Sequence, residues 1–352
     1  MNPTIMHCHR FQPVVSDNKL YLYAPVKSDK LSCMNRTAFV IPFVILMLAV
    51  SSVWAQFRVT NLKCEYLAYP IGIDESHPRF VWQLKSAQPG TLQKAFHLIV
   101  GTLESEVKSG IGNTWNSGIT AANIIPVVYR GTELQPFTRY FWSVRIQDEE
   151  GNWSEWSPVA FFETGMMDQR NWMGKWITDT YDFTIKPAPL FRKEFTSSKK
   201  ISTARAYIAV AGLYELSING KRVGDHRLDP MYTRFDRRTL YVTYDVTDHL
   251  RQGANAIGVM LGNGWYNHQS TAVWYFDKAP WRARPRFCLD LRITYEDGSA
   301  ETIVSGQEWK TSPGPVIFNS IYTAEHYDAR LEQPGWDSPG FDASKWKSVT
   351  LT

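Results

Sequence analysis

The chain has 352 residues, and its 38 basic side chains nearly balance its 34 acidic ones. This length predicts two or three domains, and the even charge without long runs of one sign argues against nucleic-acid binding. Aromatic residues make up 14% of the chain and include 14 tryptophans, whose flat apolar faces suit an uncharged, sugar-like ligand. A β-sandwich core rich in Trp and Tyr explains the same composition, so both interpretations stay open.

The first 55 residues are interpreted as a segment that is absent from the mature protein. Residues 1–33 are polar and irregular and are interpreted as a spurious extension before the true start. Residues 34–55 have a positive start, an apolar segment over 38–50 and a small residue, Ala55, at a cleavage site, which predicts a secretory signal peptide. A transmembrane anchor is the alternative, but the apolar segment is shorter than the roughly 20 residues that span a bilayer. We expect a secreted or periplasmic protein that is no integral membrane protein after cleavage.

The cysteines argue against a disulfide framework. Cys8 and Cys33 both precede Met34, so the mature chain is expected to keep only Cys64 and Cys288, which lie far apart in the sequence. Small disulfide-stabilised domains use several closely spaced cysteines instead.

Residues 57–165 have the alternating pattern of an antiparallel β-sandwich. Period-two runs occur at 80–84, 95–100 and 140–145, separated by clusters of Gly, Pro, Asn and Asp. Leu134 to Tyr140 has the spacing of a tyrosine corner, in which the phenol bonds to upstream backbone.

A turn at 148–152 precedes Trp153-Ser-Glu-Trp-Ser157, which predicts an edge strand that stacks Trp on Arg145. These features together resemble a fibronectin type III domain. The tryptophan segment is expected to brace the sheet, with a recognition site as the alternative.

Residues 167–352 predict a second β-rich domain with no helix longer than a turn or two. Asn219-Gly220 is a strong type I′ hairpin signal between alternating strands. A jelly roll is the expected architecture, with strands at 190–195, 204–210, 213–218, 256–261 and 287–295.

Two segments of this domain point to a known family. The Ser-Ile-Asn-Gly-Lys hairpin at 217–221 and the Leu-Gly-Asn-Gly-Trp-Tyr loop at 261–266 resemble the N-terminal, galactose-binding-like, carbohydrate-binding jelly roll of bacterial α-L-rhamnosidases. The resemblance covers most of 170–350, and 322–346 is similar to the segment that precedes the family's catalytic barrel. The fold expected for the whole chain is therefore all-β, a fibronectin III-like sandwich followed by this jelly roll.

The resemblance implies that catalysis lies elsewhere. In this family the inverting hydrolysis belongs to a downstream helical barrel with two catalytic Glu residues, and we expect that barrel to be absent from this chain. Inverting hydrolysis requires two carboxyl groups about 6.5 to 9.5 Å apart with a water between them. Glu325 and Asp328, three residues apart on an extended strand, would point to opposite faces, so they are expected to brace a loop with Arg330 rather than to act as a catalytic pair. We predict no catalytic residue.

The resemblance also implies a possible calcium ion. Some family members hold L-rhamnose in this jelly roll through Ca²⁺, which accepts carboxylate, carbonyl and sugar oxygens alike. The corresponding metal ligands here would be Asp179, Asp225 and the backbone carbonyl of Pro230. The sequence departs from the family at Thr180, where an amide would be able to touch the sugar, and both aspartates are equally explained as turn-capping residues.

Aromatic side chains in loops are the candidate sugar platforms. Trp265 and Tyr266 lie in a Gly-flanked loop that is expected to expose them, although Trp265 would serve equally well as a plug at the end of the barrel. Trp274, Tyr275 and Trp281 lie in a loop-like stretch broken by a proline. The predicted sugar-binding residues are Trp265, Tyr266, Trp274 and Trp281.

The preferred hypothesis is an N-terminal α-L-rhamnosidase fragment that binds a rhamnose-containing glycan and supports a catalytic barrel. Two enzyme alternatives stay open: a glycosidase subunit whose barrel lies on another chain, and a complete enzyme truncated by gene prediction. The third alternative is an adhesive or structural surface protein built on the fibronectin-like unit. Fold similarity alone does not decide among them.

Overall fold

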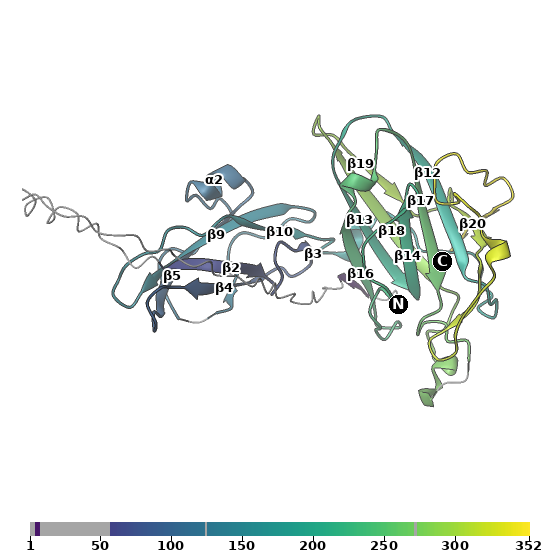
Figure 1. Ribbon diagram of the computed structural model, residues 1–352, viewed down its shortest axis with the longest axis horizontal. Coiled ribbons are helices and arrows are strands. Elements are labelled where there is room, and N and C mark those ends of the chain that lie inside the picture. The colour runs from purple at the N-terminus through teal and green to yellow at the C-terminus, as the bar shows by residue number, and fades with distance from the viewer. Residues whose placement is uncertain (1–3, 8–56, 124, 271–272) are drawn as a thin grey trace, which may run out of the picture.

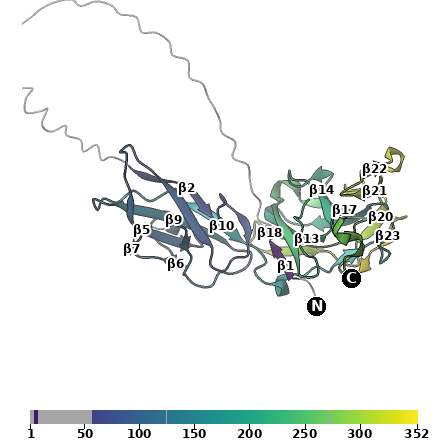
Figure 2. The ribbon, with the colours of Figure 1, turned by 90° about the horizontal axis from the view of Figure 1, so that it is seen from below.

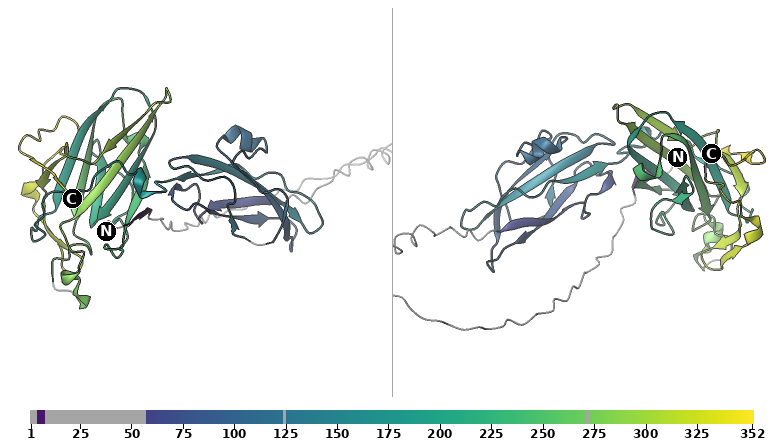
Figure 3. Two further views of the ribbon diagram at one scale, coloured as in Figure 1. Left: turned by 180° about the vertical axis from the view of Figure 1, so that it is seen from behind. Right: turned by 45° about the horizontal axis from the view of Figure 1, so that its top comes forward.

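The computed structural model describes residues 4–7, 57–123, 125–270 and 273–352. They form two β-rich domains that lie end to end along the long axis of the molecule (Figure 1), and the same arrangement is seen from behind and from above (Figure 3). The predicted signal peptide and most of the segment before it lie outside the described residues. No helix in the described part of the chain is long and apolar enough to cross a membrane.

The first domain is a sandwich of two sheets with the strand orders β2-β4-β8 and β3-β10-β9-β5-β6, with β7 also pairing β5. Its strands are β2 (Arg58–Cys64), β3 (Ile71–Ile73), β4 (Arg79–Lys85), β5 (Gln93–Gly101), β6 (Trp115–Asn116), β7 (Thr120–Ala121), β8 (Val127–Val128), β9 (Arg139–Asp148) and β10 (Ala160–Thr164), and its helix is α2 (Glu104–Lys108). The three strands predicted from period-two runs are confirmed as β4, β5 and β9. Phe80 of β4 packs against Trp142 of β9 with ring centroids 4.7 Å apart, so the alternating apolar residues meet in the core.

The tyrosine corner is confirmed. The backbone N–H of Gln135 donates to the Tyr140 hydroxyl at 2.8 Å. The Tyr140 ring also stacks on Phe162 of β10 at a centroid distance of 5.2 Å. Tyr140 is therefore structural, as its spacing indicated.

The tryptophan segment braces the sheet but is not a regular strand. The Arg145 guanidinium lies 4.9 Å from the ring centroids of both Trp153 and Trp156. The hydroxyls of Ser154 and Ser157 accept bonds from backbone N–H groups of β9, and only Trp153 forms a β-bridge. The predicted edge strand is replaced by a ladder in which serine side chains share the bonding with the backbone.

The second domain is a jelly roll of two main sheets, with the orders β1-β16-β13-β18-β11-β24 and β15-β14-β17-β12-β20-β23; β19 pairs β18, and β21 and β22 form a separate pair. Its strands are β11 (Ile177–Thr178), β12 (Pro189–Ser197), β13 (Ile201–Ala211), β14 (Leu213–Ile218), β15 (Lys221–Arg222), β16 (Arg238–Asp245), β17 (Gly253–Gly262), β18 (Arg286–Tyr295), β19 (Ala300–Val304), β20 (Lys310–Pro313), β21 (Val316–Ser320), β22 (Ala324–Tyr327), β23 (Lys347–Ser348) and β24 (Thr350–Leu351). Short 3₁₀ turns are η1 (Gln169–Asn171), η2 (Thr247–His249), η3 (Val273–Lys278) and η4 (Ala329–Leu331).

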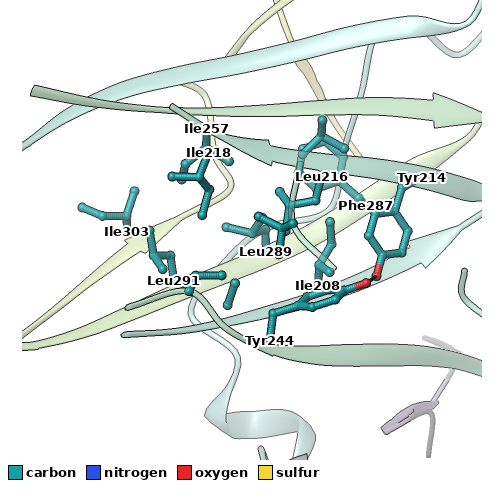
Figure 4. Close-up of a cluster of buried hydrophobic side chains, with 14 of the residues drawn as sticks. Ile208, Tyr214, Leu216, Ile218, Tyr244, Ile257, Phe287, Leu289, Leu291 and Ile303 are labelled. Carbon is teal, nitrogen blue, oxygen red and sulfur yellow. Dashed lines mark hydrogen bonds between the residues drawn. The ribbon is translucent and has the colours of Figure 1, made fainter. Parts of the chain in front are cut away.

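The core of the jelly roll lies between its two main sheets (Figure 4). Leu216 and Ile218 of β14 face Leu289 and Leu291 of β18 there, and all four side chains are buried. The hydroxyls of Tyr214 and Tyr244 share a hydrogen bond of 2.8 Å at the edge of this cluster. The five predicted strands of this domain are confirmed.

The predicted hairpin is present between β14 and β15. Asn219 and Gly220 both have positive φ angles, 54° and 74°, as a type I′ turn requires. The Asn219 side chain donates to the backbone carbonyl of His249 at 2.8 Å, which ties the turn to η2.

One strand lies within the segment interpreted as a spurious extension. Strand β1 (Thr4–His7), the purple arrow in Figure 2, pairs in parallel with β16, with Thr4 opposite Arg238. A chain cleaved after Ala55 would lack this strand, and β16 would then be an edge of its sheet.

Buried polar contacts join the two domains. Glu163 of β10 accepts bonds from Arg205 of β13 at 2.7 and 3.1 Å, and also from Arg139 of its own domain. Glu163 is 6% exposed and Arg205 7% exposed, so the ion pair lies in the interior of the joint. The Tyr241 hydroxyl of β16 donates to the carboxylate of Asp74 at 2.8 Å.

Candidate saccharide pocket

A pocket of about 330 Å³ opens at one end of the jelly roll. Its walls come from the chain segments that lead into or out of β11, β13, β16, β17, β18 and β24. The lining residues are Trp176, Ala211, Phe235, Asp236, Thr239, Tyr266, Pro280, Trp281, Arg282, Ala283, Arg286 and Thr352.

Aromatic rings from four separate segments form the walls: Trp176, Phe235, Tyr266 and Trp281. Phe235 and Tyr266 are buried and meet edge to face with centroids 5.1 Å apart. Trp176 and Trp281 are half-buried, so part of each ring is open to the pocket. Flat apolar walls with a few polar groups are typical of small-molecule sites.

The polar groups of the pocket gather around Arg286, the first residue of β18. Its Nε donates to the Tyr266 hydroxyl at 2.7 Å, its Nη2 donates to the same oxygen, and its Nη1 donates to the Thr352 hydroxyl at 2.8 Å. Burial raises the pKa of Tyr266 and the adjacent guanidinium opposes that rise. Tyr266 therefore stays a neutral phenol at physiological pH.

The two residues of the 261–266 loop play different parts. Tyr266 is only 2% exposed, so the expectation that the loop exposes both rings is wrong for this residue. Tyr266 nevertheless lines the pocket. Trp265 does not line the pocket. It packs against Phe276 at 4.8 Å and Tyr322 at 5.5 Å, which suits the alternative role of a plug at the end of the barrel.

The other two predicted platform residues are also separated by the fold. Trp281 lines the pocket. Trp274 is 78% exposed and lies with Tyr275 on the turn η3, where both residues have positive φ angles of 69° and 58°. Stacking of a sugar on Trp274 stays a prediction, but the structure places this ring outside the pocket.

Of the lining residues, the sequence analysis named Tyr266 and Trp281 and missed the others, including Trp176, Phe235 and Arg286. Trp176 and Phe235 lie in segments without an alternating pattern, so the sequence does not distinguish them from neighbouring aromatic residues such as Trp172 and Tyr232. Arg286 is the last of three arginines at alternate positions, after Arg282 and Arg284. In an extended segment this spacing places the three side chains on one face, which could have drawn attention to Arg286.

Both aspartates predicted to bind calcium have partners within the protein. Both carboxylate oxygens of Asp179 accept bonds from Arg284, at 2.8 and 2.9 Å. The Asp225 side chain is 86% exposed on a turn and lies 3.6 Å from the imidazole of its neighbour His226. Within the described ranges no group of three or more His, Cys, Asp and Glu side chains could hold a metal ion. Calcium binding by Asp179, Asp225 and the Pro230 carbonyl stays a prediction for experiment.

The expectation that Glu325 and Asp328 brace a loop with Arg330 is confirmed for Asp328 alone. Asp328 accepts bonds from the Arg330 side chain at 2.8 and 2.7 Å and from its backbone N–H at 3.1 Å. Glu325 lies on β22, whose residues are all exposed. Asp328 is therefore a bracing residue paired with Arg330.

Two family profiles match the chain. Residues 199–352 match the α-L-rhamnosidase N-terminal domain, and residues 59–168 match the Rha78A-like N-terminal immunoglobulin domain. An α-L-rhamnosidase of Formosa agariphila is 34% identical over 304 residues, an alignment that covers 79% of this chain and 32% of that protein.

Solved structures give the same result. The α-L-rhamnosidase from Dictyoglumus thermophilum superposes with a TM-score of 0.79 at 40% identity, covering 85% of this chain and 34% of that one. The Streptomyces avermitilis α-L-rhamnosidase complexed with L-rhamnose superposes with a TM-score of 0.78 at 25% identity, covering 84% of this chain and 45% of that one. The chain thus spans less than half the length of these relatives.

Proposed function

Since this chain carries the N-terminal immunoglobulin-like and jelly-roll domains of the α-L-rhamnosidase family, we propose that it is a secreted, non-catalytic part of such a glycoside hydrolase. In this proposal the jelly roll binds a saccharide unit of a rhamnose-containing glycan, and the two domains together support the catalytic part. The observation that carries the proposal is the aromatic pocket between Trp176, Tyr266 and Trp281.

The pocket suits a single sugar ring. Its volume of about 330 Å³ lies at the small end of the range of ligand pockets. The indole faces offer apolar contact to the C–H groups of the ring, and Arg286 and the Tyr266 hydroxyl offer polar contacts to its oxygens. L-rhamnose is present in the Streptomyces avermitilis structure, which makes it the first sugar to test here.

The supporting role is proposed from the joint between the domains. A buried ion pair between Glu163 and Arg205 and a hydrogen bond between Tyr241 and Asp74 link the sheets of both domains. Contacts of this kind hold two domains in one orientation, because bending the joint would expose or unpair buried charges.

The test is a calorimetric titration of residues 56–352 with L-rhamnose and with oligosaccharides from a rhamnose-containing polysaccharide. Trp281→Ala is expected to weaken binding about tenfold or more, corresponding to ~1.4 kcal/mol, because it removes a wall of the pocket. Trp274→Ala is the matched control, since it removes an equally large ring that lies outside the pocket. Loss of binding in Trp274→Ala alone would place the sugar on η3 and contradict the proposed pocket.

Two further arms address the remaining hypotheses. Repeating the titration with calcium and with EDTA tests the calcium hypothesis, which predicts tighter binding with calcium and weaker binding in Asp179→Asn. A hydrolysis assay with an aryl α-L-rhamnoside tests the enzyme alternatives, and turnover by residues 56–352 would contradict the non-catalytic role. An adhesive protein would show no heat with any saccharide.

A further inference from the structure

The polar side of the pocket is rich in hydrogen-bond donors. Arg286 has five N–H donors, and three of them are used by Tyr266 and Thr352. The two remaining N–H groups have no acceptor among the described residues. No carboxylate in the described part of the chain forms an ion pair with Arg286.

This unpaired state sets Arg286 apart from the most buried arginines of the jelly roll. Arg192, Arg205 and Arg284 each have a carboxylate partner, respectively Glu194, Glu163 and Asp179. A guanidinium that is withdrawn from water is normally matched by an anion, because burying an uncompensated charge is unfavourable. Arg286 is half-buried and lines a cavity instead.

Tyr266 adds a further donor at the same place. Its oxygen already accepts two N–H groups from Arg286, so its own O–H proton must find another acceptor. No acceptor for it is present within the described ranges. Since Tyr266 is only 2% exposed and lines the pocket, the acceptor for this O–H is a water molecule or a ligand group in the pocket.

The other charged residues of the lining do not neutralise this site. Asp236 is already engaged by Arg234, whose Nε and Nη2 donate to its two carboxylate oxygens at 2.9 and 3.0 Å. Arg282 directs its guanidinium to the Asn267 side chain and the Asp277 carbonyl, neither of which lines the pocket. The lining therefore carries two guanidinium groups without an ion pair to a carboxylate of the described residues, those of Arg282 and Arg286, and Arg286 is the one that contacts the Tyr266 hydroxyl.

We infer that the pocket binds a hexuronate, a six-carbon sugar whose C6 is a carboxylate, with that carboxylate on Arg286 and Tyr266. The inference deepens the proposed saccharide-binding function and rests on it. A carboxylate only accepts hydrogen bonds and has about four lone-pair sites, which matches two free N–H groups and one O–H. The tryptophan walls then contact the apolar face of the sugar ring.

The experiment compares two pairs of sugars that differ only at C6 within each pair, with L-rhamnose as a further neutral sugar. Residues 56–352 are titrated calorimetrically with methyl glycosides of D-glucuronate and D-galacturonate, with their neutral counterparts methyl D-glucoside and D-galactoside, and with L-rhamnose. At least one acid is expected to bind about tenfold or more tighter than its neutral counterpart. This preference should shrink as the salt concentration rises, because the contact is between charges.

Variants test whether Arg286 causes the preference for acidic over neutral sugars. Arg286→Met should abolish the difference between acid and neutral sugar, while Arg286→Lys should keep part of it, because lysine retains the charge without the planar fork. Arg330→Met is the matched control, since Arg330 does not line the pocket and pairs with Asp328 on the surface. Near-ultraviolet circular dichroism of each variant checks that the fold is retained; if Arg286→Met is unfolded, Tyr266→Phe carries the same test by removing the O–H.

The outcomes separate this inference from the proposed function. Equal or tighter binding of the neutral sugars, weakened by Trp281→Ala, would overturn the hexuronate inference and leave the saccharide pocket standing. A preference for the acids that survives Arg286→Met and Tyr266→Phe would also overturn it. Absence of binding by every sugar would overturn both.

Discussion

The buried ion pair between Glu163 and Arg205 predicts that the domain joint contributes substantially to stability. Replacing Glu163 by Gln keeps the shape of the side chain but removes its charge, and Arg205 is then left buried without its main partner. Removing one member of a buried pair typically destabilises a protein by about 3–5 kcal/mol. Arg205 keeps a second carboxylate, Asp245, at 3.0 Å, but that side chain is 53% exposed and compensates only in part. We therefore expect Glu163→Gln to lower the free energy of unfolding by about 2–3 kcal/mol.

The assay is urea unfolding of residues 56–352 at pH 7, followed by tryptophan fluorescence. The double variant Glu163→Gln/Arg205→Met should be more stable than Glu163→Gln alone, since no unpaired charge is then buried. Glu133→Gln is the control at an exposed position, with an expected change below about 0.5 kcal/mol. A loss below about 1 kcal/mol for Glu163→Gln, or a double variant less stable than the single one, would refute the reasoning.

Three further predictions concern single groups. Tyr140→Phe should destabilise the first domain by about 1–3 kcal/mol, seen as a lower melting temperature, because the Gln135 N–H loses its acceptor; an unchanged melting temperature would argue against the tyrosine corner. Arg170 lowers the pKa of Asp168 to about 2 through its hydrogen bonds, so an NMR titration of Arg170→Met should move that pKa up toward 3.8. The favourable contribution of this pair is present above the unfolded pKa and is lost as the pH falls through about 2, and an unmoved pKa would contradict the assignment. Cys64 and Cys288 are both free, and burial raises the pKa of their thiols. Neither thiol should therefore react with Ellman's reagent in residues 56–352 until the chain is unfolded. Rapid labelling of the folded chain would contradict this expectation by showing that one of the thiols is accessible.

Local patterns predicted the fold well. Alternating apolar residues, the Asn219-Gly220 turn and the spacing of Tyr140 each act over a few residues, so their structural consequences can be derived from short stretches of sequence. The same is true of the Arg145 ladder, apart from the serine hydroxyls that replace part of its backbone pairing.

The pocket was harder to predict because it is assembled from distant segments. Trp176, Phe235 and Tyr266 meet only when strands far apart in the sequence pair, and no short stretch contains more than a fraction of the site. The position of Tyr266 in a Gly-flanked loop also led to a wrong expectation of exposure, because its ring packs against Phe235 and its hydroxyl is bound by Arg286.

The overall charge of a protein does not fix the charge of one cavity. The balance of 38 basic and 34 acidic side chains led to the expectation of an uncharged ligand. Binding depends on the groups that line one cavity, and there Arg286 is not matched by a carboxylate of the described chain. A nearly neutral protein can therefore contain a positively charged site.

The most direct test of a saccharide pocket is a two-dimensional NMR titration that follows the indole N–H signals of residues 56–352 as oligosaccharides from a rhamnose-containing polysaccharide are added. The pocket predicts that the signals of Trp176 and Trp281 shift together with saturation, while those of Trp142 and Trp309, which are fully buried in the two cores, do not move. Saturable shifts confined to Trp274, or no shift of any indole signal, would contradict it.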